Sequence, residues 1–212
     1  MISHLVFDLD GTLVPSNDVK RDAFFACVEG INGAGEIIAS MLDADPTRDR
    51  YRVFGELVER LPASGDAAGL VARYSAICHE KVVALLNDGV TDALLDLLRH
   101  KSLTLHLSSG TPRDSLFAMM RETGLDRHFF GINGSPTAKA DNLRAIMQKH
   151  DLNATQLAVI GDGDSDAQAA AAVGCAFLRV AEDASKLHGQ PAREGCAFLT
   201  SRLDLVSREA AA

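Results

Sequence analysis

Two carboxylates close to the amino terminus are the side chains of this sequence best placed to do chemistry. Asp8 and Asp10 follow the apolar run 4–7, and Gly11 and Thr12 come directly after them. An apolar run bounded by turn residues predicts a buried strand, and parallel sheets bind ligands just outside the carboxyl ends of their strands. Asp-x-Asp-Gly is also an ordinary strand-ending turn. The functional interpretation is favoured because further polar segments of matching character follow later in the chain.

The residues after the apolar run 103–107 are typical of an anion cradle. Ser108, Ser109 and Gly110 stand between that run and a predicted helix. Amides of a glycine-containing turn and of a helix start attract anions, and the Ser108 hydroxyl adds a neutral donor. The same residues also fit an ordinary loop before a helix.

Lys139 stands at the start of the predicted helix 138–150. The helix dipole favours anions at that end, so a cation there suggests a separate task, such as holding a negative ligand or a carboxylate. A solvated lysine is the alternative interpretation.

Three acids gather in a second strand-end segment, where Asp162, Asp164 and Asp166 follow the apolar run 157–160. Like charges repel, so such a group is favoured when a cation binds it. Carboxylate oxygens suit Mg²⁺. A helix N-cap accounts for one of these acids but not for all three.

The elements that must position these residues alternate between strand and helix in most of the chain. This alternation predicts a parallel sheet with helices on both faces. The predicted strands are 4–8, 103–108, 129–133, 156–161 and 175–180, and the helices between them are 90–100, 112–123, 138–150 and 165–173. The stretch between the first strand and residue 87 instead predicts helices only, at 18–29, 34–42, 48–60 and 67–86.

The predicted fold is therefore α/β, with a Rossmann-like three-layer α/β/α core and an inserted all-helical domain. We expect the core to comprise residues 1–14 and 87–212, and the helical cap domain residues 15–86. Because the insert begins directly after the first carboxylate pair, it is expected to lie over the site as a hinged lid that excludes water. A rigid helical layer is the alternative.

Composition limits the partners and the compartment. The 212 residues carry a formal net charge of −8 and a pI near 5.3, which argues against nucleic acid as a partner. No apolar stretch reaches the length of a membrane span and no signal sequence is recognised, so we expect a cytoplasmic protein. Neither the four cysteines nor the seven histidines show the spacing of a metal site. Free thiols and structural or solvated histidines are expected, with a Cys27–Cys78 disulfide as the alternative.

Together, and in this order, the four polar segments resemble those of the haloacid dehalogenase superfamily. Its members carry D-x-D-G-T, a strand-end Ser or Thr, a Lys and G-D-x-x-x-D, and the helical insert is similar to the superfamily's C1-type cap. The resemblance covers the whole chain and is nearest to phosphoglycolate phosphatases and β-phosphoglucomutases. One departure is Pro15, where many capped members have Asp.

The resemblance implies a role for each residue of the first motif. Asp8 is implied to be the nucleophile that forms an aspartyl-phosphate, which suits a group that is ionised near neutral pH. Asp10 is implied to be the general acid and base. Gly11 and Thr12 would keep the backbone close to the phosphoryl group.

The resemblance also implies a cofactor, Mg²⁺. Its ligands would be a side-chain oxygen of Asp8, the backbone carbonyl of Asp10 and the carboxylate of Asp162, with Asp166 bound directly or through water. The role of Asp164 is left open.

The phosphoryl oxygens would be bound by Ser108 and Lys139, with the amides of Ser109 and Gly110 as additional donors. In the helical insert, Arg50 is the first choice for binding the distal end of a substrate, because a guanidinium suits carboxylate or phosphate. A solvated basic face is the alternative for this segment.

The function that follows from the resemblance is a Mg²⁺-dependent phosphatase for a small phosphorylated metabolite, such as a sugar phosphate or a phosphoglycolate-like acid. Phosphoryl transfer like that of β-phosphoglucomutase and a catalytically silent binding module are the alternatives. A dehalogenase is disfavoured because it has no use for Asp10 or for a metal site. Both a monomer and a homodimer fit these motifs.

Overall fold

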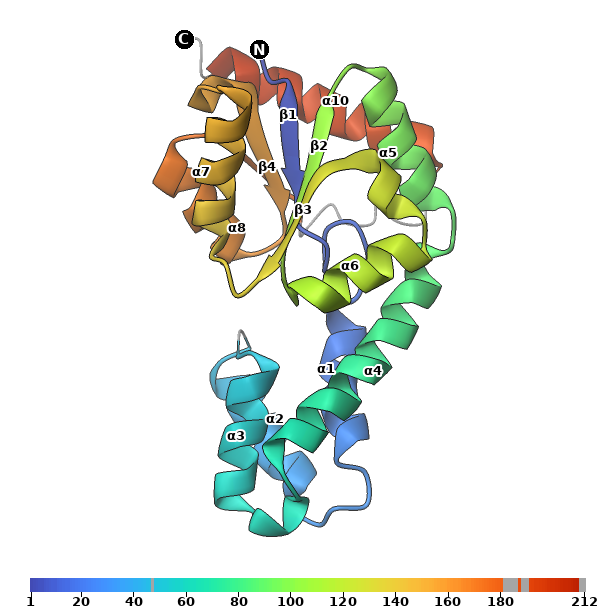
Figure 1. The fold of residues 1–212 in the computed structure, drawn as a ribbon, viewed down its shortest axis with the longest axis vertical. Helices are drawn as coiled ribbons and strands as arrows, with labels where there is room; N and C mark the ends of the chain where they lie inside the picture. Colours follow the sequence, from blue (N-terminus) through green and yellow to red (C-terminus); the bar gives the residue numbers. More distant parts are fainter. Residues whose placement is uncertain (47, 181–186, 188–190, 210–212) are drawn as a thin grey trace. The chain divides into compact units, whose positions relative to one another are not determined.

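The computed structural model describes residues 1–46, 48–180, 187 and 191–209. Two compact units are formed, one by Met1–Pro15 with Val83–Ala212 and the other by Ser16–Val82. The first unit is built around a five-stranded parallel sheet with the strand order β3-β2-β1-β4-β5 (Figure 1). The predicted α/β fold with a parallel sheet is therefore confirmed.

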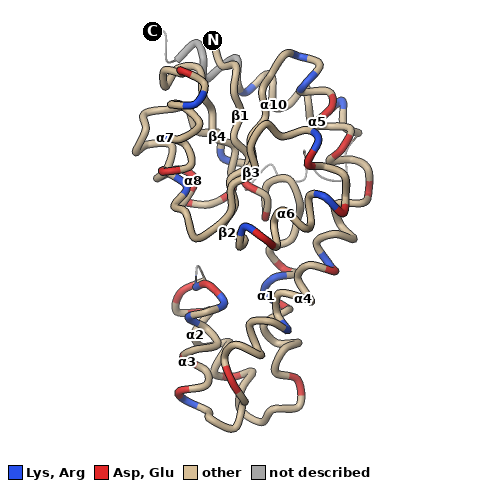
Figure 2. The backbone as a smooth tube through the Cα atoms, viewed as in Figure 1, with Lys and Arg blue, Asp and Glu red and all other residues tan. Residues whose placement is uncertain are grey.

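The strands of the sheet are short and apolar, as buried parallel strands are. They are β1 His4–Phe7, β2 Thr104–Pro112, β3 Phe129–Ser135, β4 Leu157–Gly161 and β5 Ala176–Arg179. Arg179 is the only charged residue in these described strands, and Figure 2 shows the charges of this unit mainly on its helices and loops. The central strand β1 pairs with β2 on one side and with β4 on the other.

Helices cover both faces of the sheet (Figure 1). On one face, α7 (Lys139–His150) and α8 (Asp164–Val173) pack on Val6 and Val159 through Leu143, Ile146 and Ala169. On the other, α5 (Val90–His100) packs against α10 (Ala192–Glu209). Helix α6 (Arg113–Glu122) follows β2, and the short 3-10 helices Leu125–His128 and Ala154–Gln156 precede β3 and β4. Helix α10 was not predicted.

Strand β2 continues four residues beyond its predicted end at residue 108, because it is bulged rather than turned. Ser108 pairs with Asn133 and Pro112 with Ser135, so β2 spends four residues where β3 spends two. Gly134 permits this crowding, since a Cβ there would lie 2.5 Å from the Cα of Arg113. The segment predicted as a glycine turn is therefore a bulge within β2. It places the hydroxyls of residues 108–111 at the carboxyl end of the sheet.

The second unit contains α1 (Asn17–Cys27), α2 (Ala34–Ala44), α3 (Arg50–Arg60), the 3-10 helix Pro62–Ser64 and most of α4 (Ala67–Leu86). Its core is aromatic at the centre, where the Phe24 ring lies 4.4 Å from Tyr74 and 5.5 Å from Phe54 between centroids. Helix α3 begins at Arg50, not at residue 48 as predicted. Asp49 caps it by accepting hydrogen bonds from the amides of Tyr51 and Arg52.

Two predictions from composition concern the chain as a whole. In the described ranges, no helix has the length and apolar character needed to span a membrane. The four cysteines are free thiols, three of them buried and Cys175 half-buried, as predicted. A Cys27–Cys78 disulfide is not formed.

Candidate active site

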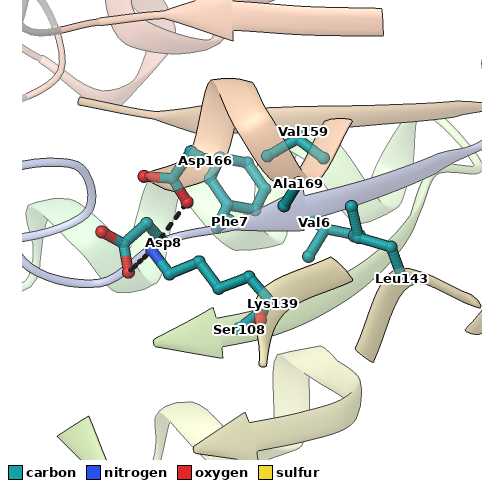
Figure 3. Close-up of a pocket in the computed structure, with 9 residues that line it drawn as sticks. All are labelled: Val6, Phe7, Asp8, Ser108, Lys139, Leu143, Val159, Asp166 and Ala169. Carbon is teal, nitrogen blue, oxygen red and sulfur yellow. Dashed lines mark hydrogen bonds and ion pairs between the residues drawn. The ribbon is translucent and has the colours of Figure 1, made fainter. Parts of the chain in front are cut away.

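The predicted chemical residues of the first unit meet at the carboxyl edge of its sheet. Asp8 follows β1, Ser108 lies on β2, Lys139 begins α7 and Asp166 lies in the first turn of α8. Strand β1 stands between β2 and β4, so the ends of these strands are neighbours. A pocket is lined by these four side chains and by apolar residues of the sheet and helices (Figure 3).

A tight turn after β1 holds both carboxylates of the first motif at this edge. The amide of Asp8 donates to the carbonyl of Ile160 at 2.9 Å, which extends the pairing with β4 by one residue. The chain then reverses, and the Leu9 carbonyl accepts hydrogen bonds from the amides of Leu13 and Val14. Gly11 has a φ of 74°, a left-handed conformation that favours glycine at this point of the turn.

Lys139 is the central cation of the site. Its Nζ lies 2.7 Å from Oδ1 of Asp166 and 3.1 Å from Oδ1 of Asp8. The ammonium thus joins the first and the last acidic motifs, whose positions in the sequence are far apart, and Figure 3 shows it between the two carboxylates.

Burial and charge shift the pKa values of this group in opposing ways. Burial raises the pKa of Asp8 to about 7, although the Lys139 ammonium opposes that rise. Burial also raises the pKa of Asp166, again against the influence of Lys139. For Lys139, burial alone would lower the pKa, but the two carboxylates outweigh it and raise the pKa. The lysine is therefore charged, and one cation faces two acids that burial disfavours as anions.

Three carboxylates of this edge fit a divalent cation. One oxygen from each of Asp8, Asp162 and Asp166 lies within 4.8 Å of the others. Oδ2 of Asp166 is buried and accepts no hydrogen bond in the described chain, whereas Oδ1 of Asp8 is buried beside the Lys139 ammonium. Gly161 makes room for this group, since a Cβ there would lie 2.4 Å from the Asp166 carboxyl carbon. Buried oxygens without hydrogen-bond donors are the ligands that a hard cation such as Mg²⁺ prefers.

Asp164, whose role the sequence left open, lies apart from that group of three. Its carboxylate is exposed and accepts a hydrogen bond from Nη2 of Arg179 at 2.6 Å. Arg179 also donates to the backbone carbonyl of Asp162 at 2.9 Å. Arg179 therefore fixes the loop that carries the acids while it holds the Asp164 side chain at the surface.

Two partners of the site residues were missed in the sequence. Thr111 donates from Oγ1 to Oδ2 of Asp10 at 3.2 Å, and Asn142 donates from Nδ2 to Oγ of Ser108 at 3.1 Å. Asn142 stands three residues after Lys139, on the same face of α7, and that spacing could have revealed it. Thr111 offered no comparable signal, because its position depends on the bulge in β2.

The remaining predicted site residues of the first unit are Ser109, Gly110 and Thr12. Ser109 is buried, and its Oγ accepts a hydrogen bond from the amide of Thr111 at 3.1 Å. Gly110 is exposed, with no atom within 4 Å of an added Cβ. Thr12 is fully buried, and in the described chain its hydroxyl has no hydrogen-bond partner.

Arg50, the predicted substrate ligand of the helical unit, is engaged inside that unit. Its Nη1 donates to Oγ of Ser75 at 2.9 Å, and its guanidinium carbon lies 4.7 Å from the centre of the Tyr74 ring. The neighbouring Arg48 forms ion pairs with Glu56 and Asp45. These arginines therefore have partners within their own unit.

Comparison with known proteins identifies the family that most of the chain matches. The family model of the haloacid dehalogenase-like hydrolases matches residues 2–174. A phosphoglycolate phosphatase from Chromobacterium violaceum is 30% identical over 196 residues, which cover 84% of this chain and 85% of that protein.

Solved structures share the fold at lower identity. CbbY from Rhodobacter sphaeroides, solved in complex with phosphate, has a TM-score of 0.60 and 18% identity, covering 84% of this chain and 85% of its own. A haloacid dehalogenase-like family protein from Streptococcus pneumoniae has a TM-score of 0.57 and 23% identity, covering 93% of this chain and 98% of its own. The resemblance found in the sequence is confirmed: the chain belongs to the haloacid dehalogenase-like hydrolases and is an enzyme of the phosphatase type.

Proposed function

We propose that this chain is a Mg²⁺-dependent phosphomonoester hydrolase in which Asp8 is the nucleophile and Asp10 the general acid and base. The observation that carries the proposal is the position of the Asp8 carboxylate. It lies at the end of a buried strand, and its Oδ1 is 3.1 Å from the Lys139 ammonium. A carboxylate held in this way is oriented by a cation before the substrate binds.

In the first step, a carboxylate oxygen of Asp8 attacks the phosphorus of the substrate. The bond from phosphorus to the alkyl oxygen breaks as the aspartyl-phosphate forms, and Asp10 gives its proton to the departing alkoxide. The hydrogen bond from Thr111 to Oδ2 of Asp10 orients that carboxyl group.

In the second step, Asp10 acts as the base. It takes a proton from a water molecule, whose oxygen attacks the phosphorus of the aspartyl-phosphate. The bond between phosphorus and the Asp8 oxygen then breaks, inorganic phosphate leaves, and the Asp8 carboxylate and protonated Asp10 are restored. Atoms and charges balance across the two steps without a further reactant.

Attack of a carboxylate on a phosphate dianion brings like charges together, so the site must supply positive charge. Lys139 supplies one charge at the attacking oxygen. Asp8, Asp162 and Asp166 would hold Mg²⁺, together with the backbone carbonyl of Asp10. When bound, the ion neutralises charge on the transferring phosphoryl group.

Neutral donors complete the proposed phosphoryl site. Because Asn142 donates to Oγ of Ser108, the hydroxyl hydrogen of Ser108 is free to point at a phosphoryl oxygen. The amides of Ser109 and Gly110 are proposed as further donors from the bulge of β2. Such fixed dipoles stabilise charge that develops during transfer without a desolvation cost at that moment.

The substrate is proposed to be a small phosphorylated metabolite, with the helical unit acting as the cap that restricts access. The relative from C. violaceum is named a phosphoglycolate phosphatase, and a CbbY variant was solved with xylulose 1,5-bisphosphate. These compounds belong in the first set of substrates to test. Arg50 remains the proposed contact for the distal end of the substrate.

The proposal is tested by phosphate release from phosphoglycolate, sugar phosphates, xylulose 1,5-bisphosphate and p-nitrophenyl phosphate, with Mg²⁺ or with EDTA. We expect Mg²⁺-dependent release, and a loss of at least about a thousandfold in kcat for Asp8→Asn, since that change removes the nucleophile. Asp164→Asn is the matched control, because Asp164 is an exposed acid of the same edge paired with Arg179.

Each failure of this experiment has a distinct meaning. Isomerisation of a sugar phosphate without net release would favour a mutase. Binding of phosphate with no turnover of any compound would favour a silent binding module. Equal losses in Asp8→Asn and Asp164→Asn would contradict the assignment of Asp8 as nucleophile.

A further inference from the structure

Three histidines that are distant in the sequence cluster at the other end of the same sheet. His4 begins β1, His106 lies on β2 and His150 is the last residue of α7. One ring nitrogen from each lies within 4.8 Å of the others. The ring centroids are 5.6 Å apart for His4 and His106, 4.9 Å for His4 and His150, and 5.2 Å for His106 and His150.

The pairing of β1 with β2 explains why these rings meet. His4 is opposite Thr104 and Val6 is opposite His106, so His4 and His106 are diagonal neighbours on one face of the sheet. That face is the one covered by α7, because Val6 packs against Leu143 of this helix. The carboxyl end of α7 therefore brings His150 onto the same face.

Three ring nitrogens of this cluster lack hydrogen-bond partners in the described chain, whereas Nδ1 of His4 is hydrogen-bonded to Oγ of Ser3 at 3.0 Å. His106 is 1% exposed, and in the described chain neither of its ring nitrogens forms a hydrogen bond. The Nε2 of His150 is also buried and without a partner there. A buried polar group without a partner is costly, so each instance calls for an explanation such as a bound ion.

The chemical form of the rings suits metal binding. Burial lowers the pKa of His106 to about 3, and the neighbouring His150 and His4 act in the same direction. Burial likewise lowers the pKa of His4. Both rings are therefore neutral near pH 7, and each neutral imidazole has a lone pair available for a metal.

We propose that His4, His106 and His150 bind one divalent transition metal ion, with Zn²⁺ as the best match. Imidazole nitrogens suit zinc, whereas the carboxylates of the catalytic edge suit Mg²⁺. A tetrahedral zinc ion holds nitrogens about 3.3 Å apart, given bonds of about 2.0–2.1 Å. Binding therefore draws the half-buried rings of His4 and His150 toward His106 and leaves one coordination position open.

This site is separate from the catalytic one but shares its supporting elements. Asp8 stands four residues after His4, which is about 13 Å along an extended strand. Lys139 and His150 are the first and last residues of α7. A metal at the histidines would cross-link β1, which Asp8 follows, to β2 and α7, which carry Ser108 and Lys139. The inference does not depend on the proposed function.

The competing explanation is that the rings only pack together. The Phe130 ring lies 4.5 Å from that of His150 and 6.0 Å from that of His106, in edge-on contacts typical of aromatic packing. The Lys149 ammonium lies over the Phe130 ring, 4.7 Å from its centre. Packing accounts for the contacts but not for the unpartnered nitrogens, and metal binding separates the two explanations.

The test measures Zn²⁺ binding to the full chain without a histidine tag. Protein treated with EDTA is dialysed against Zn²⁺ in the presence of excess Mg²⁺, which competes with Zn²⁺ for the acidic group. We expect one Zn²⁺ per chain, bound more than about tenfold less tightly by His150→Ala. His100→Ala is the matched control, because His100 ends α5 as His150 ends α7, but is exposed and lies outside the cluster.

A second variant shows which site holds the ion. Asp162→Asn removes a carboxylate of the acidic group and should leave the zinc stoichiometry at one. Zinc should also raise the melting temperature of the wild type and of Asp162→Asn, but not that of His150→Ala. Loss of zinc in Asp162→Asn, or wild-type affinity in His150→Ala, would overturn the proposal. Because His150 is half-buried, its variant is expected to fold, which circular dichroism checks.

Discussion

The two ends of β1, β2 and α7 bury polar groups in opposite ways. At the carboxyl edge, Asp8 and Asp166 are buried anions whose pKa values are raised, and Lys139 stands between them. At the amino end of the strands, His106 is a buried base and His4 a half-buried one, and the pKa values of both are lowered. Both ends contain nitrogens or oxygens that lack hydrogen-bond partners in the described chain.

The contrast shows that burial alone does not determine what a site needs. The imidazoles of His4 and His106 avoid the desolvation penalty by remaining neutral, so they can lie side by side without a counter-charge. A carboxylate must stay ionised to attack phosphorus, so it requires a cation beside it before any substrate binds. We therefore expect the loss of a charged group at the catalytic edge to lower activity far more than the loss of a neutral hydrogen bond there.

Removal of the Lys139 charge should have the largest effect on that edge. Lys139→Met keeps a long side chain but removes the ammonium that lowers the pKa of Asp8. The pKa of Asp8 then rises above about 7, so the acidic limb of the pH–rate profile moves to higher pH. We expect kcat at pH 7 to fall by about 10²–10³. Phosphate release measured between pH 5 and 9 checks both effects.

Arg179→Met is the matched control for the lysine. It also removes a cation of this edge, but the partners of Arg179 are the exposed Asp164 carboxylate and the Asp162 carbonyl rather than Asp8. Its acidic limb should coincide with that of the wild type. If Lys139→Met lost activity with no shift of its acidic limb, Lys139 would act on the substrate alone and not on Asp8.

The second prediction separates the acids of the 162–166 segment. Asp162→Asn should raise the Mg²⁺ concentration needed for half-maximal activity by about 10–100-fold, since it removes a charged oxygen from the proposed ligand set. Asp164→Asn should change that concentration by less than about twofold, because its side chain faces solvent and pairs with Arg179. Titration of the activity with Mg²⁺ measures this concentration for both variants. Equal increases in the two variants would contradict the proposed ligand set.

The third prediction concerns a neutral hydrogen bond of the same edge. Asn142→Ala removes the donor to Oγ of Ser108, so the hydroxyl of Ser108 is no longer held in one orientation. We expect kcat/KM to fall by about tenfold, much less than after loss of the lysine charge. Because Asn142 is argued to act through Ser108, the double variant should lose no more than Ser108→Ala alone. Additive losses would mean that Asn142 acts independently.

The fold could be predicted from the sequence because its strands are apolar runs that end at turn residues. Helix α10 was not predicted, although its residues Cys196, Leu199 and Leu203 recur at helical spacing and are buried. The prediction also ended β2 four residues early. The bulge there depends on the close approach of Gly134 on another strand, and no local pattern reports such a contact.

The site residues that could be predicted are likewise those whose positions depend on the local sequence, and the missed ones depend on contacts between distant segments. Asp8 and Lys139 are recognisable because a strand end and a helix start are visible in the local sequence. Thr111 depends on the bulge, and the expectation of structural or solvated histidines took no account of His4 beside His106. That proximity follows from the register of β1 against β2, which the separate strand sequences do not contain.

The smallest predicted effect is on the free energy of unfolding. It tests whether burial of the ionised Asp8 carboxylate destabilises the folded protein. The pKa of Asp8 is raised in the folded protein, so the folded state binds more protons than the unfolded state between about pH 4 and pH 7. Stability therefore falls as pH rises through that window, and the full penalty is present above about pH 7. Asp8→Asn removes the penalty while Lys139 keeps its ion pair with Asp166.

In the absence of divalent cations, the melting temperature of Asp8→Asn should exceed that of the wild type at pH 8 by roughly 2–4 °C, as expected for about 1 kcal/mol in a protein of this size. The difference should shrink toward zero at pH 4, where Asp8 is protonated in the folded wild type. Added Mg²⁺ should stabilise the wild type more than the variant, because the ion offsets the same charge. A variant less stable than the wild type at pH 8 would show that Asp8 and Lys139 are net stabilising as a pair, and that the desolvation of Asp8 is already offset without a metal.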